Sequence, residues 1–265
     1  MYKLKSLFLD YLKQKLDEYM SELSVSSGVP IRILRPKERF GIVRARMMGA
    51  DIASGSVLTF LDSHCECNAG WLEPLLSRVA EDRTRVVSPI IDIIDDRTFE
   101  YYAASDQIWG GFNWKLQYKW FEIPEREKVR RAGDLTSPLR TPVMAGGIFS
   151  IDKEYFKHIG QYDDAMRIWG HDNIELSIRV WACSGSVEMI PCSRVGHVFR
   201  YDTPYMDSEE KMKVTNNNVC RIVDLWYNEW MMFFYNLYPY TLEGKEGDVS
   251  SRREIIQNIG CKGMI

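Results

Sequence analysis

The sequence lacks several features by which common classes of protein are recognised. Its strongest apolar run, Trp230 to Tyr235, is six residues long, whereas about 18 apolar residues are needed to cross a bilayer. Near the start, Lys3 and Lys5 precede an apolar run that Asp10 interrupts, so no signal peptide or other targeting segment is predicted. No basic run is longer than two residues and the formal net charge is −3, which argues against nucleic acid as the main partner.

Cysteine is present, but its spacing indicates no metal or redox motif. The six cysteines include no Cys-x-x-Cys pair, which argues against a zinc ribbon or a thioredoxin-like site. In a chain of this length, an even number of cysteines does not by itself fix the redox compartment.

The first third of the chain alternates helical and strand patterns. Apolar residues make up 45% of the sequence and aromatic residues 12%, enough for a packed core. The pattern predicts a helix over residues 4–23, broken at 28–30, a short strand over 31–34, a helix over 42–53, a strand over 57–61, a helix from Trp71 and a strand around 86–91. This order favours an α/β fold with a mostly parallel sheet and helices on both faces.

The remainder of the chain is less regular. Alternating aromatic and apolar residues predict a strand over 112–120, and the charged stretch 125–140 reads as a surface loop. Helical spacing returns over 172–183 with Gly185 as the expected C-cap, a strand and turn follow at 188–191, and a last helix covers about 218–238. No repeat or low-complexity linker interrupts the chain, so residues 1–265 are expected to form a single domain.

The candidate chemistry lies directly after the strand over 57–61. Asp62 and His64 are two residues apart, so on extended backbone their side chains point the same way. This is the end of a strand at which open α/β sheets bind ligands. A carboxylate and an imidazole suit a borderline divalent metal ion, although the same pattern also fits an ordinary polar loop. His197, flanked by apolar residues, is a possible third ligand or a core histidine bonded to the backbone, and His158 is expected on the surface.

The residues around this site resemble the polypeptide N-acetylgalactosaminyltransferases. The resemblance holds in order and spacing from about Leu12 to Lys262. Its most specific stretches are Arg39 to Arg46, Leu58 to Glu66, Trp71 to Leu76, Pro142 to Phe149 and Pro191 to Arg200. It implies a Rossmann-like nucleotide-sugar glycosyltransferase domain of the GT-A type. The implied activity is retaining transfer of N-acetylgalactosamine from UDP-GalNAc to Ser or Thr of polypeptides, which initiates mucin-type O-glycosylation.

The resemblance also implies roles for individual residues. Asp62, His64 and His197 match the family's Mn2+ ligands, and Asp172 and Asn173 match catalytic-site positions to which we assign positioning rather than proton transfer. Donor contacts are implied for Arg39, Ser63, Ala145, Gly146, Trp169, Arg200 and Tyr205. Cys183 and Cys261 match paired cysteines, and Cys192 is expected to be unpaired. The Golgi lumen is the implied location, with contact to membrane only through an anchor absent from this chain.

The sequence departs from the family in two ways. The family usually has Trp-Gly-Gly-Glu-Asn where this chain has Trp169-Gly170-His171-Asp172-Asn173, with a shorter carboxylate and a bulkier neighbour. The family's first strands, membrane anchor and C-terminal lectin domain also have no counterpart, so the domain is expected to be incomplete at its N-terminus. We therefore expect the 265-residue chain alone to bind donor weakly and not to turn it over.

Two other functions are compatible with parts of the sequence. The two departures favour a catalytically impaired fragment or relative that binds a peptide or partner protein. A processive sugar polymerase of the same fold would need a Gln-x-x-Arg-Trp motif and membrane helices, and the sequence has neither.

Overall fold

The computed structural model describes residues 13–199, 206–245 and 247–262. The chain divides into two compact units, Met1–Arg39 and Phe40–Ile265, and each is described by itself. None of the helices within the described residues combines the length and the apolar character that crossing a membrane requires.

The first unit contains one described helix. Helix α2, Gln14–Ser27, buries none of its residues and ends at Gly28, whose φ is 66°. The predicted helix therefore continues beyond residue 23, and the predicted break at 28–30 is correct. Residues 31–34 form no strand, so that prediction was wrong. Arg35 instead turns back to helix α2, where its Nη2 lies 2.7 Å from Asp17 Oδ1.

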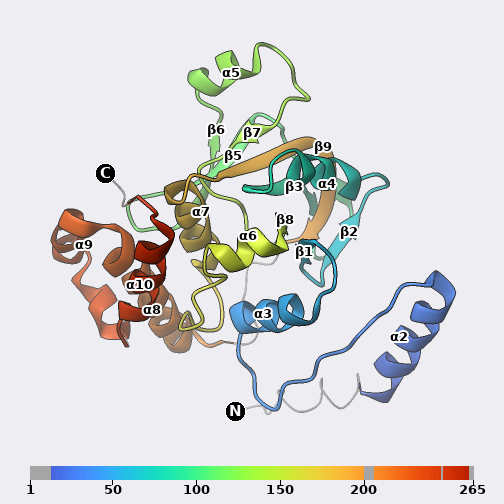
Figure 1. Ribbon diagram of the computed structural model, residues 1–265, viewed down its shortest axis with the longest axis horizontal. Coiled ribbons are helices and arrows are strands. Elements are labelled where there is room, and N and C mark those ends of the chain that lie inside the picture. The colour runs from blue at the N-terminus through green and yellow to red at the C-terminus, as the bar shows by residue number, and fades with distance from the viewer. Residues whose placement is uncertain (1–12, 200–205, 246, 263–265) are drawn as a thin grey trace. The chain divides into compact units, whose positions relative to one another are not determined.

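A mixed sheet forms the centre of the second unit (Figure 1). Its strand order is β1-β8-β3-β9-β2, with two-residue strands β4 beside β3 and β7 beside β9. The strands are β1 Val57–Leu61, β2 Cys65–Cys67, β3 Arg85–Ile94, β4 Tyr101–Tyr102, β7 Leu139–Arg140, β8 Ile148–Asp152 and β9 Ser186–Val198. Of the neighbouring pairs only β3 and β9 are parallel. The prediction of a mostly parallel sheet was therefore wrong, because β8 returns antiparallel between β1 and β3.

Helices cover both faces of this sheet, as predicted. Alternate residues of a strand point to opposite faces, and β3 shows the division. Val87 packs against Leu75 and Val79 of helix α4, Leu72–Glu81. Val86 points into the main core, which contains residues of helices α3 Ile42–Ile52, α6 Lys153–His158, α7 Asp172–Ala182 and α8 Ser208–Trp226. Each face of the sheet thus buries its own set of apolar side chains.

The segment after β4 differs from its prediction. Residues 108–122 form a hairpin of β5, Ile108–Phe112, and β6, Tyr118–Glu122, rather than one strand over 112–120. The Asn113 side chain accepts hydrogen bonds from the backbone N–H of Lys115 and Gln117 and so stabilises the turn. The stretch 125–140, predicted as a loop, contains helix α5, Glu125–Arg131, and strand β7.

Two predicted helix ends also differ. Helix α7 is followed by Ser184 with a φ of 65°, so Ser184 rather than Gly185 adopts the left-handed conformation. Gly185 is needed for space, because a Cβ there would lie 2.2 Å from the Tyr155 hydroxyl. The predicted helix over 218–238 is interrupted after α8 at Asn228, whose φ is 43°. The segments that follow are η1 Asn228–Trp230, α9 Met231–Leu237, η2 Pro239–Gly244 and α10 Ser250–Ile259.

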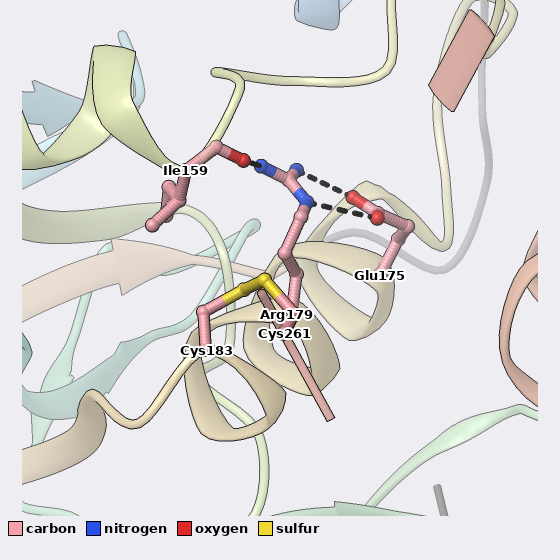
Figure 2. The surroundings of a disulfide bond; sticks show 5 residues. All are labelled: Ile159, Glu175, Arg179, Cys183 and Cys261. Carbon is pink, nitrogen blue, oxygen red and sulfur yellow. Dashed lines mark hydrogen bonds and ion pairs between the residues drawn. A yellow bond between two sulfur atoms is a disulfide. The ribbon is translucent and has the colours of Figure 1, made fainter. Parts of the chain in front are cut away.

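A disulfide joins the end of helix α7 to the last described residues (Figure 2). It links Cys183 to Cys261, the pair that the family resemblance implies, with a Cα–Cα distance of 4.2 Å. One turn earlier in α7, Arg179 and Glu175 form a fully buried ion pair, and Arg179 also donates to the backbone oxygen of Ile159. Cys192 is exposed and carries a free thiol.

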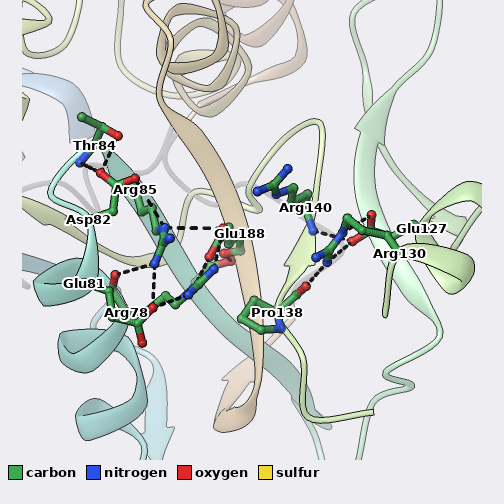
Figure 3. A network of polar contacts seen from close by, with 11 residues as sticks. Arg78, Glu81, Asp82, Thr84, Arg85, Glu127, Arg130, Pro138, Arg140 and Glu188 are labelled. Carbon is green, nitrogen blue, oxygen red and sulfur yellow. Dashed lines mark hydrogen bonds and ion pairs between the residues drawn. The ribbon is translucent and has the colours of Figure 1, made fainter. Parts of the chain in front are cut away.

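Ion pairs also fix helix α4 to the sheet (Figure 3). Arg78 of α4 donates from two nitrogens to Glu188 of β9, whose side chain is 1% exposed. Such a bidentate arrangement constrains the orientation of both side chains. Together with the disulfide it fixes both faces of the sheet on which the candidate site is built.

We predict that replacing Cys183 by Ser lowers the free energy of unfolding by about 4 kcal/mol, because the cross-link closes a long loop in the unfolded chain. Urea denaturation without reductant measures this difference. Cys192→Ser is the matched control, since its thiol is exposed and unpaired, and it should leave the midpoint unchanged. Equal stability of the Cys183→Ser variant and the original chain would contradict the prediction.

Candidate metal centre

Three residues that the sequence analysis singled out lie together at one edge of the sheet. Asp62, His64 and His197 each offer a ligand atom, and these atoms all lie within 4.8 Å of one another. His197 Nε2 is 3.7 Å from Asp62 Oδ2, and the two imidazole rings have centroids 4.4 Å apart. Within the described parts of the chain this is the one such group of acidic, histidine or cysteine side chains.

The register of the strands brings these three residues together. Asp62 follows directly after β1, and His64 precedes β2. Strand β2 runs antiparallel to β9 so that Cys65 faces His197, and the Val198 backbone N–H donates to the His64 backbone oxygen at 3.0 Å. His197 is thus held beside His64 by the sheet itself, although 133 positions separate them along the chain numbering.

The donor set fits a divalent metal ion. Burial alone would raise the pKa of Asp62, but contact with His197 and the charge of Arg46 bring it below its usual range, so the carboxylate is ionised. His197 Nδ1 is buried and forms no hydrogen bond with any described residue. One carboxylate oxygen and two imidazole nitrogens form the kind of mixed ligand set that binds borderline divalent ions.

Arg46 connects this cluster to the start of helix α7 and was missed as a site residue. Its Nη2 lies 2.9 Å from Asp62 Oδ1 and its Nη1 lies 3.6 Å from Asp172 Oδ2. Its side chain is 9% exposed, and its guanidinium packs over the rings of Phe60 and Phe149. A signal was available, because an arginine three residues after Val43 and four before Ala50 lies on the buried stripe of the helix and needs a charged partner there.

Asp172 and Asn173 open helix α7 beside this arginine. Burial raises the pKa of Asp172, while Arg46 and the backbone N–H of Gly170 act in the opposite direction by stabilising its charge. Asn173 Nδ2 donates to the backbone oxygen of Met144 at 2.9 Å. The two side chains are therefore fixed by contacts to α3 and to the segment before β8.

Gly146 and Gly147 pass between Asn173 and Asp62 with no room for side chains. Gly146 has a φ of 85°, and a Cβ there would lie 2.5 Å from the Asn173 Cβ. A Cβ on Gly147 would lie 2.9 Å from Asp62 Oδ2. Glycine at these two positions lets the Asn173 and Asp62 side chains approach the backbone closely.

The other predicted donor residues are described by their exposure or by their position in the chain. Ser63 is exposed between Asp62 and His64. Trp169 is 44% exposed in the loop before helix α7. Arg39 is the last residue of the first unit. Arg200 and Tyr205 lie outside the described residues.

His171 lies in a buried environment that disfavours its protonated, charged form. It precedes α7 with a φ of 68°, and its Nδ1 is buried and forms no hydrogen bond with any described residue. Burial lowers the pKa of His171 to about 4. Its side chain borders a cavity of about 330 Å³ that is also lined by Lys115 and Tyr238. His158, by contrast, is exposed on α6 as predicted.

Comparison with known proteins assigns this architecture to a family. The model described as glycosyl transferase family 2 matches residues 9–156, and that described as the N-terminal domain of galactosyltransferase matches residues 129–203. Polypeptide N-acetylgalactosaminyltransferase 13 of Homo sapiens is 51% identical over 253 residues, 96% of this chain and 45% of that protein. Polypeptide N-acetylgalactosaminyltransferase 5 of Caenorhabditis elegans is 46% identical over 256 residues, 96% of this chain and 40% of that protein.

A solved structure is similar throughout. The crystal structure of GalNAc-T7 with UDP, GalNAc and Mn2+ matches with a TM-score of 0.85 and 35% identity, covering 96% of this chain and 46% of that chain. The fold is therefore that of a glycosyltransferase of the GT-A type, as the sequence predicted. The chain belongs to glycosyl transferase family 2, and its resemblance to the polypeptide N-acetylgalactosaminyltransferases is confirmed. It spans less than half the length of the curated relatives that it matches.

We predict that His171 makes folding stability depend on pH. An unfolded histidine binds a proton below about pH 6.5, whereas folded His171 does so only near 4. Between these values the unfolded state binds more protons, so stability is fully present above pH 6.5 and falls as the pH drops.

Replacing His171 by Gly should remove this dependence and relieve the positive φ. We expect the original chain to lose about 2 kcal/mol more stability than the variant between pH 7.5 and pH 5. Urea denaturation at both pH values measures the difference, with exposed His158→Gln as the control. Equal losses in the original chain and the His171→Gly variant would show that His171 is not buried in the neutral form.

Proposed function

We propose that this protein is a manganese-dependent, retaining transferase that moves N-acetylgalactosamine from UDP-GalNAc to Ser or Thr of polypeptides and so initiates mucin-type O-glycosylation. The observation that carries the proposal is the cluster of Asp62, His64 and His197, joined through Arg46 to Asp172. The similar GalNAc-T7 structure contains UDP, GalNAc and Mn2+, and the similar curated proteins are polypeptide N-acetylgalactosaminyltransferases.

Under this proposal the metal is held by the three clustered side chains. Bound there, Mn2+ would neutralise negative charge on the departing diphosphate. Asp62 is ionised and so supplies an anionic ligand, while the two imidazoles supply neutral nitrogen ligands. Arg46 keeps Asp62 in place by a direct ion pair.

Asp172 and Asn173 act as positioning residues. Retaining transfer needs no strong base from the protein when the leaving phosphate takes the acceptor proton, so neither side chain has to abstract it. Their contacts to Arg46 and Met144 fix their orientation before substrate binds, which supports catalysis by preorganisation. The backbone at Ala145 and Gly146 would lie beneath the donor sugar, and Arg39, Ser63, Trp169, Arg200 and Tyr205 would contact the rest of the donor.

The proposal includes a domain assignment and a location. Residues 1–265 would form part of one glycosyltransferase catalytic domain. The Golgi lumen, where the family acts, would be its compartment. The disulfide between Cys183 and Cys261 supports an oxidising compartment.

A second candidate function is binding of a polypeptide without turnover. The observation that favours it is His171-Asp172 at the start of α7, where the Asp172 carboxylate is 6% exposed and already paired with Arg46. Calorimetric titration of UDP in the presence of Mn2+ separates the two functions, because the second does not require donor binding.

We predict that replacing His197 by Ala weakens Mn2+ binding at least about 100-fold, since loss of even an outer hydrogen-bond partner costs 10–100-fold. Titration with Mn2+, followed by electron paramagnetic resonance of the free ion, measures the affinity. His158→Ala removes an exposed histidine away from the cluster and should bind Mn2+ like the original chain. Unchanged affinity in the His197→Ala variant would place the metal elsewhere.

The activity itself is tested by transfer of labelled N-acetylgalactosamine to a Thr-rich peptide. We expect transfer by the natural protein that requires Mn2+ and falls at least about 100-fold in Asp62→Asn, because the metal loses its anionic ligand. Donor binding with Mn2+ but no transfer would favour the impaired relative. Clear transfer by the 265-residue chain would contradict the expectation that it does not turn donor over, and would leave the proposed function standing.

A further inference from the structure

The loop before helix α7 has a strained backbone conformation that contacts with neighbouring elements must stabilise. Within residues 167–171, Ile168, Gly170 and His171 have φ values of 36°, 100° and 68°. Positive φ is unfavourable for a β-branched residue such as Ile168, and such a residue persists only where the surroundings determine its conformation. Two neighbouring elements supply contacts of that kind.

Asn218 of helix α8 binds the loop with its whole carboxamide. Its Oδ1 accepts from the Arg167 backbone N–H at 2.9 Å, and its Nδ2 donates to the backbone oxygens of Arg167 at 3.0 Å and Gly170 at 2.8 Å. Asn217 Nδ2 also donates to Asn218 Oδ1. The carboxamide thus uses both N–H groups and two acceptor positions. The side chain is 1% exposed, so water does not compete for these bonds.

The opposite side of the loop rests on the start of helix α3. The Ile42 backbone N–H donates to the Ile168 backbone oxygen at 2.8 Å. A Cβ on Gly41 would lie 2.3 Å from the Ile168 Cα, so the two backbones are in close contact. The loop is therefore held at Ile168 by the start of helix α3, and at Arg167 and Gly170 by Asn218.

The loop positions two residues of the candidate site. It carries the half-exposed Trp169 and leads directly into Asp172, whose carboxylate is paired with Arg46. A change in the backbone of Gly170, two residues before Asp172, would therefore alter how helix α7 begins and how Asp172 is presented. The candidate metal-ligand cluster lies further from the loop, where Arg46 also pairs with Asp62.

We infer that Asn218 is a positioning residue for the donor site, an inference that rests on the proposed function. It holds the backbone of residues 167–170 so that Trp169 and Asp172 keep the orientation in which they meet the nucleotide sugar. It does not hold the metal. Loss of its hydrogen bonds should therefore impair donor binding while Mn2+ affinity is retained.

The chain provides a matched control two residues away. Asn216 lies on the same helix, is also buried, and donates from Nδ2 to the backbone oxygen of Tyr240, in segment η2 rather than in the loop. Asn218→Asp keeps the size of the side chain but replaces both N–H donors by an oxygen that faces two carbonyl groups. Asn216→Asp makes the same chemical change where it affects η2 instead.

The experiment uses the natural protein with three measurements: amide hydrogen exchange, Mn2+ affinity, and KM and kcat for UDP-GalNAc. For Asn218→Asp we expect exchange of the amides of residues 167–172 to accelerate at least about tenfold. We expect the donor KM to rise about tenfold or more, with Mn2+ affinity within about twofold, since positioning rather than ligation is lost. Asn216→Asp should accelerate exchange only near residues 238–241 and leave the donor KM unchanged.

Each result supports or overturns the inference. Unchanged exchange in the loop of Asn218→Asp, or a loosened loop with unchanged KM and kcat for the donor, overturns it while the proposed function stands. If Asn218→Asp does not fold, Asn218→Ser, which keeps one donor, should still raise the donor KM, and an unchanged KM there overturns the inference as well. Failure of the proposed function would differ from all of these, because the unmodified protein would then bind no UDP-GalNAc with Mn2+.

Discussion

The candidate site depends on one buried arginine that pairs with two carboxylates from distant parts of the chain. Arg46 lies between Asp62, at the end of β1, and Asp172, at the start of α7. Two nearby buried carboxylates would repel each other without it, and burial of each alone would favour its neutral form. The ion pairs keep Asp62 charged and fix α3, β1 and α7 in one arrangement. Removing one partner of such a group is costly because the remaining charges stay buried.

Space is the second constraint at this site. Backbone segments replace side chains on the path from Asp62 to Asn173, since neither Gly146 nor Gly147 could carry a Cβ without a close contact. The loop that contains Trp169 has positive φ at Ile168, Gly170 and His171, and hydrogen bonds from Asn218 fix its backbone. The site thus combines charged contacts around the metal ligands with neutral backbone contacts around the candidate donor position. A substitution can therefore affect the candidate donor position without affecting the candidate metal ligands.

The frame that supports the site is fixed independently of it. The bidentate pair of Arg78 with Glu188 joins α4 to β9, and the buried pair of Arg179 with Glu175 and the disulfide of Cys183 hold the other end of α7. Both α7 and β9 carry site residues at one end and these fixed contacts at the other.

The sequence by itself determined the strands and helices with regular periodicity, such as β1 and α4. It also predicted that Asp62, His64 and His197 lie together, because Asp62 and His64 follow a buried strand in a family register that includes His197. It did not determine the strand order, since pairing of β8 between β1 and β3 joins residues far apart in the chain. The hairpin at 108–122 was misread because a turn inside an alternating pattern depends on the Asn113 side chain. The position of Arg46 on a buried helix stripe indicated a charged partner, but which carboxylates it pairs with was decided only in three dimensions. Asn218 took its role only from the loop that packing brings to it.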